Sequence, residues 1–303
     1  MKTIKGIIPP MITPLKGDDQ IDREGTVRLT EHILAGGVHA LFLLGTTGEA
    51  QSLSYKCRYD FVELVCRQVA GRVPVLVGVT DTSLDESVKL AAHAAKCGAV
   101  AVVAAAPYYF APSQQELIEY YTALADALPL PLFLYNMPSH VKVFLEPATV
   151  KTLAEHPNIV GLKDSSANMT YFQTLLYHLG DREDFALYVG PEELTGESVV
   201  MGADGGVNGG ANIFPELYVQ MYYAACNYDV NTMHTLQQKI MQISTSLYTV
   251  GKYGSSYLKG VKCALSLLGI CDDYLSYPYR KFRSEERDKI RNALEKLGAS
   301  CKI

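Results

Sequence analysis

The chain contains 303 residues, of which 48% are hydrophobic and 19% are charged, and its formal net charge is −5. This balance is typical of a globular protein and excludes a disordered chain. A mildly acidic chain without a dense cluster of Lys and Arg offers no surface for nucleic acid. The apolar stretch 99–112 is too short to span a membrane. We therefore expect a protein that binds neither nucleic acid nor a membrane.

The 7 cysteines are scattered along the chain and form no C-x-x-C pair. Such spacing favours reduced thiols over disulfides or a zinc site. The early apolar run 6–12 is interrupted by Pro9 and Pro10, which is unlike a signal peptide. We therefore expect a cytoplasmic protein without a metal.

Short apolar runs alternate along the chain with amphipathic segments. Most of the runs are continuously apolar, which is typical of parallel strands that are covered on both faces. The predicted strands are 6–13, 40–45, 73–79, 99–106, 131–136, 159–165, 185–190 and 205–212. The predicted helices between them are 23–35, 55–69, 84–96, 113–127, 147–155, 171–179 and 192–201. Ser113 and Glu116 have the spacing of a capping box at one helix start.

Eight strands that alternate with helices predict a (β/α)₈ barrel, the TIM barrel. A doubly wound sheet is the alternative, but no G-x-G-x-x-G sequence follows a strand. After residue 212 only helices are predicted, at 215–225, 229–249, 255–268 and 284–297. We therefore predict a catalytic barrel at 1–226 and a helical C-terminal extension, packed on the barrel, at 227–303.

Lys163 lies near the end of the sixth predicted strand. Lysine is rarely buried unless it is paired or has a chemical role. Burial removes hydration and disfavours the charged amine, which leaves a nucleophile that can form a Schiff base with a carbonyl compound. The alternative is a side chain whose ammonium group reaches past the strand end into water.

Other chemically useful groups follow neighbouring strands, and barrel enzymes place their chemistry at these carboxyl ends. Thr46 and Thr47 lie in a turn between Gly45 and Gly48, where hydroxyl and backbone N–H groups can hold a carboxylate. Tyr135 ends the fifth strand and can transfer protons. The alternatives are an ordinary turn and a buried structural tyrosine.

The last two strands lead into further candidates. Gly190 ends the seventh strand and Glu192 follows it, and Val207 lies in the glycine-rich eighth. Glu192 has a second interpretation, because acidic side chains at a helix start stabilise the helix dipole. The glycine-rich strand has one too, since this part of a barrel often binds phosphate.

The motifs at 45–49, 135–138 and 161–165, in this order, resemble those of the dihydrodipicolinate synthase/N-acetylneuraminate lyase family. The resemblance extends from about residue 6 through the C-terminal helices. It implies a (β/α)₈ barrel that joins or splits pyruvate through a lysine Schiff base. It also implies a homotetramer (a dimer of dimers) or a homodimer, with no metal or other cofactor beyond the covalent imine.

The resemblance also implies residue roles. Lys163 matches the Schiff-base lysine, Tyr135 its proton-transfer partner and Thr46 the hydroxyl that relays the proton. Thr47 matches a residue that binds the pyruvate carboxylate. Tyr109 matches a catalytic tyrosine that many members of the synthase branch contribute to a neighbouring subunit's site.

One departure bears on the second substrate. Synthase members carry Arg where this chain has His140, and His lacks the planar bidentate fork that holds a carboxylate. Glu192 and Glu193 stand where the sialate lyase branch has an acidic pair for polyol hydroxyls. We therefore predict substrate binding by His140 and Glu192, together with Gly45, Thr47, Gly48, Gly190 and Val207.

The combined interpretation is a Schiff-base aldolase. We expect it to cleave a 2-keto-3-deoxy sugar acid or a sialic-acid-like substrate into pyruvate and an aldehyde, or to catalyse the reverse reaction. The alternative within this chemistry is 4-hydroxy-tetrahydrodipicolinate synthase, which condenses pyruvate with aspartate semialdehyde. An alternative from another class is a barrel that binds a phosphorylated ligand without covalent chemistry.

Overall fold

A computed structural model describes residues 4–299 and 301. Within these residues, eight strands form one sheet in the order β1-β10-β9-β8-β7-β6-β5-β4, and all neighbours are parallel. The strands are β1 Gly6–Ile7, β4 Leu41–Leu43, β5 Val75–Gly78, β6 Ala101–Ala105, β7 Leu132–Asn136, β8 Ile159–Asp164, β9 Ala186–Val189 and β10 Gly205–Gly206.

The segment after β1 closes the sheet into a barrel. Pro10 forms a parallel bridge with Phe42 in β4. The Phe42 N–H donates to the Pro9 carbonyl at 3.0 Å, and the Met11 N–H donates to the Phe42 carbonyl at 2.8 Å. The chain therefore forms the predicted (β/α)₈ barrel, and β1 and β4 are neighbours across its closure.

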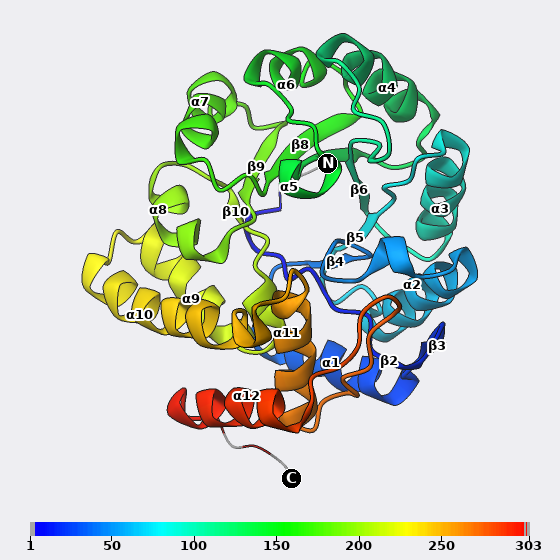
Figure 1. The fold of residues 1–303 in the computed structure, drawn as a ribbon. Helices are drawn as coiled ribbons and strands as arrows, with labels where there is room; N and C mark the ends of the chain where they lie inside the picture. Colours follow the sequence, from blue (N-terminus) through cyan, green and yellow to red (C-terminus); the bar gives the residue numbers. More distant parts are fainter. Residues whose placement is uncertain (1–3, 300, 302–303) are drawn as a thin grey trace.

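Most of the helices form a ring around the strands (Figure 1). The helices of the described residues are α1 Arg23–Ala35, α2 Tyr55–Val69, α3 Leu84–Lys96, α4 Gln114–Ala127, α5 Pro138–Val141, α6 Pro147–Leu153, α7 Met169–Leu179, α8 Thr195–Val200, α9 Pro215–Cys226, α10 Val230–Leu247, α11 Ser256–Leu267 and α12 Ser284–Lys296. Side-chain caps define several starts, and Ser113 and Glu116 form the predicted capping box. The helices α1 to α3 begin and end at the predicted residues.

The predicted eighth strand at 205–212 is wrong beyond residue 206. The chain continues from β10 into a 3₁₀ turn at Gly209–Asn212. Asn212 fixes this turn, because its amide donates to the carbonyls of Pro10 and Gly209 and accepts from the Ile12 N–H. A side chain that bonds the backbone in this way competes with a strand ladder. A short hairpin, β2 Leu15–Gly17 and β3 Gln20–Ile21, and the helix α5 were not predicted.

The C-terminal helices α10 to α12 pack against one another, and α10 contacts α9 of the barrel (Figure 1). Residues 1–3 of the predicted barrel unit, and 300, 302 and 303 of the predicted extension, lie outside the described residues. Across the described part of the chain, no helix is both long enough and apolar enough to cross a membrane.

Candidate active site

Lys163 lies on β8 and is only 7% exposed. Its Nζ lies 4.2 Å from the centroid of the Tyr135 ring and 5.2 Å from that of Phe42. The face of an aromatic ring attracts an ammonium group. Once that group loses its proton, the ring does not occupy the lone pair of the resulting amine. The amine therefore stands inside the barrel, rather than reaching into water past the strand end.

Tyr135 stands directly opposite Lys163 in the parallel pairing of β7 with β8. Its hydroxyl lies 3.3 Å from the Thr46 Oγ1. Burial raises the pKa of the Tyr135 phenol, but the positive charge of Lys163 and hydrogen bonds that include Thr46 outweigh it, so the net pKa lies below its ordinary value. The structure thus brings an amine, a phenol and a hydroxyl together in an arrangement that can transfer protons.

The turn that carries Thr46 and Thr47 is held in an unusual backbone shape. The Gly48 N–H donates to the Gly45 carbonyl at 3.0 Å, and the Glu49 N–H donates to the Thr46 carbonyl at 3.1 Å. Leu44 and Glu49, on either side, have φ of 55° and 56°. Left-handed backbone at non-glycine residues is strained and concentrates at functional sites. The strain therefore supports a functional interpretation of the turn.

A cavity of about 280 Å³ opens next to Thr46 and Tyr135. Gly45 and His140 also line it. Further hydroxyl groups in its wall come from Thr80, Tyr108, Ser255, Tyr257 and Tyr279. Within the described residues, no Lys or Arg side chain lines this cavity. A larger cleft of about 500 Å³ lies on another part of the molecule, where α1, α9, α10 and α12 meet.

Three further predicted residues pack close to this site. Val207 borders the small apolar void that Lys163 and Phe42 also line. The Gly48 carbonyl accepts the Thr13 hydroxyl at 2.7 Å, which fixes the turn. The Gly190 N–H donates to the Asp164 carbonyl at 2.6 Å, and a Cβ at position 190 would come within 2.1 Å of the Ser165 Oγ. Only glycine therefore fits at 190 without a shift.

Of the predicted residues, Gly45, Thr46, Tyr135 and His140 line the cavity, whereas the others, Lys163 and Thr47 among them, do not. Glu192 is buried, and its carboxylate accepts hydrogen bonds from the hydroxyls of Tyr218 and Tyr248 and from the Gly210 N–H. It thereby joins the segment after β10 to α9 and α10. Tyr109 is 81% exposed and packs edge-on against Phe110, with ring centroids 5.0 Å apart.

Sequence reasoning missed two groups that support the site. The Asn136 amide donates to the Asp164 Oδ1 at 2.8 Å and accepts from the Leu145 N–H at 3.1 Å. Because β7 and β8 end at these residues, the bond fixes the ends that carry Tyr135 and Lys163. Tyr257, on α11, contacts the Thr47 Oγ1 through its hydroxyl at 3.1 Å. No local pattern distinguishes it from the other tyrosines of this Tyr-rich chain.

Glu192 predicts a pH dependence of stability. Burial raises its pKa from 4.5 to about 7, although hydrogen bonds from Tyr218 and Gly210 oppose the shift. The folded state then binds a proton more tightly than the unfolded state. The resulting stability is complete below about pH 4.5 and is lost as the pH rises to about 7, with a slope of up to about 1.4 kcal/mol per pH unit.

We expect urea unfolding to give a smaller free energy of unfolding at about pH 8 than at about pH 5. In Glu192→Gln this difference should shrink, because glutamine does not titrate. An equal pH slope in both proteins would assign the dependence to other groups.

A buried lysine inside a (β/α)₈ barrel, next to a phenol and a turn that carries two hydroxyls, is the arrangement that a lysine-dependent aldolase needs. The chain belongs to the dihydrodipicolinate synthetase family, whose model matches residues 3–297. It is a pyruvate-dependent enzyme of the lyase, aldolase and synthase type that this family comprises.

Two relatives with different names resemble the chain to a similar degree. It is 34% identical over 297 residues to 4-hydroxy-tetrahydrodipicolinate synthase of Methanopyrus kandleri, covering 97% of each chain. It is 33% identical over 301 residues to the probable 2-dehydro-3-deoxy-D-pentonate aldolase YjhH of Escherichia coli, covering 98% of this chain and 99% of that one. A solved structure of dihydrodipicolinate synthase from Bacteroides thetaiotaomicron has a TM-score of 0.95 and 59% identity, covering 98% of this chain and 99% of that one.

Proposed function

We propose that this enzyme is a Schiff-base aldolase that cleaves a 2-keto-3-deoxy sugar acid to pyruvate and a hydroxylated aldehyde, or joins the two. The observation that carries the choice of substrate is the cavity beside Tyr135, which is rich in hydroxyl groups and has no Lys or Arg in the part of its wall that the structure describes. Hydroxyl groups exchange hydrogen bonds with a polyol, whereas a second carboxylate needs a cation or a dense set of donors.

The proposed reaction begins at Lys163. Its neutral amine attacks the C2 carbonyl of the substrate, and loss of water gives an iminium. Thr46 and Thr47 hold the C1 carboxylate through hydroxyl and backbone N–H groups. Tyr135 accepts the proton of the C4 hydroxyl as the C3–C4 bond breaks. The electrons of that bond pass to the iminium and leave an enamine of pyruvate, and protonation at C3 and hydrolysis release pyruvate.

His140 supports a neutral second substrate. Partial burial, and then the positive charge of Lys142, lower the pKa of the His140 imidazole, so it is largely neutral at pH 7. Lys142 donates to the Ser139 carbonyl at 2.9 Å. Of the two basic side chains at this position of the chain, His140 is thus largely neutral and Lys142 already has a partner. Both favour an aldehyde that lacks a carboxylate.

The second candidate is 4-hydroxy-tetrahydrodipicolinate synthase. The 59% identity to the structure of dihydrodipicolinate synthase from Bacteroides thetaiotaomicron favours it, as do the relatives named 4-hydroxy-tetrahydrodipicolinate synthase. The third possibility, a barrel that binds a phosphorylated ligand without covalent chemistry, loses its support because the chain belongs to a family of pyruvate-dependent enzymes.

The deciding experiment measures two reactions with one protein sample. Pyruvate release is followed over a panel of 2-keto-3-deoxy sugar acids and sialic acids, and condensation of pyruvate with aspartate semialdehyde is followed in parallel. We expect kcat/KM for at least one sugar acid to exceed that for the condensation by about tenfold or more. A condensation as fast as the best cleavage would assign the enzyme to the synthases.

His140→Arg should improve the use of aspartate semialdehyde. A guanidinium at this position supplies the charge-assisted, bidentate contact that a carboxylate needs, which corresponds to a gain of about tenfold in kcat/KM for the condensation. His140→Gln, which adds a donor but no charge, is the control and should give no such gain. Equal condensation rates in wild type and His140→Arg would contradict a carboxylate-binding role for this position.

The proposal includes neither metal nor dissociable cofactor, because the iminium on Lys163 is itself the electron sink. It includes a homotetramer or a homodimer in which Tyr109 enters a neighbouring subunit's site. Sedimentation at the enzyme's working concentration tests the assembly.

A further inference from the structure

We propose that Lys262 is a positioning residue for substrate: through a buried ion pair with Glu49, it holds the turn whose Thr46 and Thr47 bind the substrate carboxylate. The inference rests on the proposed function and goes beyond it, because it gives the C-terminal helix α11 a part in substrate binding. Figure 1 shows α11 beside the barrel, between the region of α9 and that of α1.

The ion pair is enclosed, and each of its two groups has a further backbone partner. The Lys262 side chain is 0% exposed and that of Glu49 is 1% exposed, and their charged groups are in direct contact. Lys262 also donates to the Tyr274 carbonyl at 2.7 Å, and the Glu49 Oε2 accepts from the Ser276 N–H at 2.9 Å. A buried pair of this kind is weak evidence for stability, and a better explanation is that it fixes one geometry.

The fixed geometry is that of the carboxylate-binding turn. Glu49 follows Thr47 by two residues and has a left-handed φ of 56°. Such backbone persists only where the surroundings hold it, and the ion pair holds this residue by its side chain. A second contact from the same helix reaches the turn, because the Tyr257 hydroxyl lies 3.1 Å from the Thr47 Oγ1.

The position of Tyr257 is itself constrained. A Cβ at Gly209 would lie 1.7 Å from the Tyr257 hydroxyl oxygen, so this oxygen packs directly on the backbone after β10. Helix α11 therefore meets the turn at two points, Lys262 with Glu49 and Tyr257 with Thr47.

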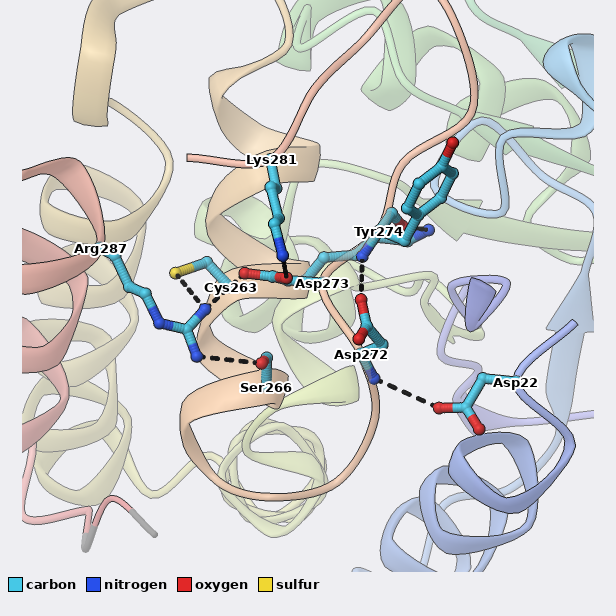
Figure 2. Close-up of polar contacts among 9 residues, drawn as sticks. Asp22, Cys263, Ser266, Asp272, Asp273, Tyr274, Lys281 and Arg287 are labelled. Carbon is cyan, nitrogen blue, oxygen red and sulfur yellow. Dashed lines mark hydrogen bonds and ion pairs between the residues drawn. The ribbon is translucent and has the colours of Figure 1, made fainter. Parts of the chain in front are cut away.

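The backbone partners of the ion pair lie on a strap, which we define as residues 271–276. Figure 2 shows how neighbouring elements hold it. The Asp272 N–H donates to Asp22, at the start of α1, at 3.3 Å, and the Asp272 carboxylate accepts from the Tyr274 N–H at 2.8 Å. Asp273 pairs with Arg287 of α12, which also donates to Ser266 of α11 at 3.1 Å. The strap is thus fastened to α1, α11 and α12.

Charge gives Lys262 an effect that packing alone would not have. With Lys262 present, the negative charge of Glu49 is neutralised beside the turn. Without it, an unpaired carboxylate would repel the substrate carboxylate that Thr46 and Thr47 bind. Loss of Lys262 should therefore weaken pyruvate binding more than it alters the chemistry of the bound imine.

The test measures borohydride trapping of pyruvate by mass spectrometry as a function of pyruvate concentration. Lys262→Met should raise the half-saturating pyruvate concentration by about tenfold or more, as expected for a displaced binding group. The trapped fraction at saturation should stay near that of the wild type. The matched control is Lys259→Met on the same helix, where the ammonium lies over the Tyr253 ring at 4.2 Å. It should change the half-saturating concentration by less than about twofold.

A double-mutant cycle tests whether Lys262 acts through Glu49. The half-saturating concentration of Lys262→Met/Glu49→Gln should not exceed that of the weaker-binding single variant. The proposal would be overturned if the two substitutions raised the half-saturating concentration by independent factors that multiply in the double variant. It would also be overturned if a folded Lys262→Met had a half-saturating concentration within about twofold of the wild type. If Lys262→Met does not fold, Glu49→Gln is the deciding variant. We expect its half-saturating pyruvate concentration to rise by about threefold or more, and a change within about twofold would contradict the proposal.

The wild-type titration separates two failures. A saturable wild-type adduct together with unaltered variants overturns the role of Lys262 alone. Absence of any wild-type adduct overturns the proposed Schiff-base function, and the positioning role with it.

Discussion

Lys163→Ala is expected to abolish the borohydride-trapped pyruvate adduct and to lower kcat/KM for cleavage by at least about 10⁴-fold, as removal of a catalytic nucleophile does. No other group in the proposed mechanism can supply the imine nitrogen. The measurement is intact mass after borohydride treatment, followed by peptide mapping, together with steady-state kinetics.

The control for this variant is Lys151→Ala, which removes an exposed lysine at the end of α6. It should retain the adduct and the wild-type rate. An adduct that maps to a lysine other than Lys163, or one that survives in Lys163→Ala, would contradict the assignment.

Tyr135→Phe is expected to lower kcat by about 10²- to 10⁴-fold, because the variant lacks the hydroxyl that exchanges protons as the C3–C4 bond breaks. The pyruvate adduct should still form at saturating pyruvate, more slowly, because the amine remains. This separation of imine formation from turnover distinguishes a proton carrier from a residue that only packs against Lys163.

Tyr121→Phe is a matched control. Tyr121, on α4, is also buried, but its hydroxyl donates to the Ala104 carbonyl of β6. It should lose some stability and keep its kcat. A Tyr135→Phe enzyme within about tenfold of the wild-type kcat would remove Tyr135 from the proton-transfer step.

The sequence predicts the local features of this fold well. The helices α1 to α3 begin and end where predicted because Asp22, Ser54 and Ser83 cap their first turns through short-range hydrogen bonds. The eighth strand was predicted too long because the decisive contacts, from Asn212 to Ile12 and Pro10, join opposite ends of the chain. Periodicity carries no information on such contacts.

The same distinction applies to the candidate site. Lys163, Tyr135 and Thr46 are adjacent in space because parallel strands align their carboxyl ends, which strand order alone predicts. Tyr257 is separated from Thr47 by 210 residues, and it arrives on a helix outside the barrel. Glu192 also illustrates the limit, because its three hydrogen-bond donors come from segments that no sequence pattern places around it.

The cavity wall has a consequence for how selectivity in this enzyme can change. Gly254, Ser255, Tyr257 and Tyr279 contribute to that wall, and all of them lie beyond the last barrel strand. In the proposed mechanism the carbon–carbon chemistry depends on residues at the strand ends, whereas part of the cavity wall is encoded in a separate stretch of the gene. Libraries that vary 254, 255 and 279, and that keep Tyr257 with its contact to Thr47, should therefore alter which aldehydes are accepted while the lysine chemistry continues unchanged. Removal of the extension, by contrast, should leave a barrel with an unfinished substrate chamber.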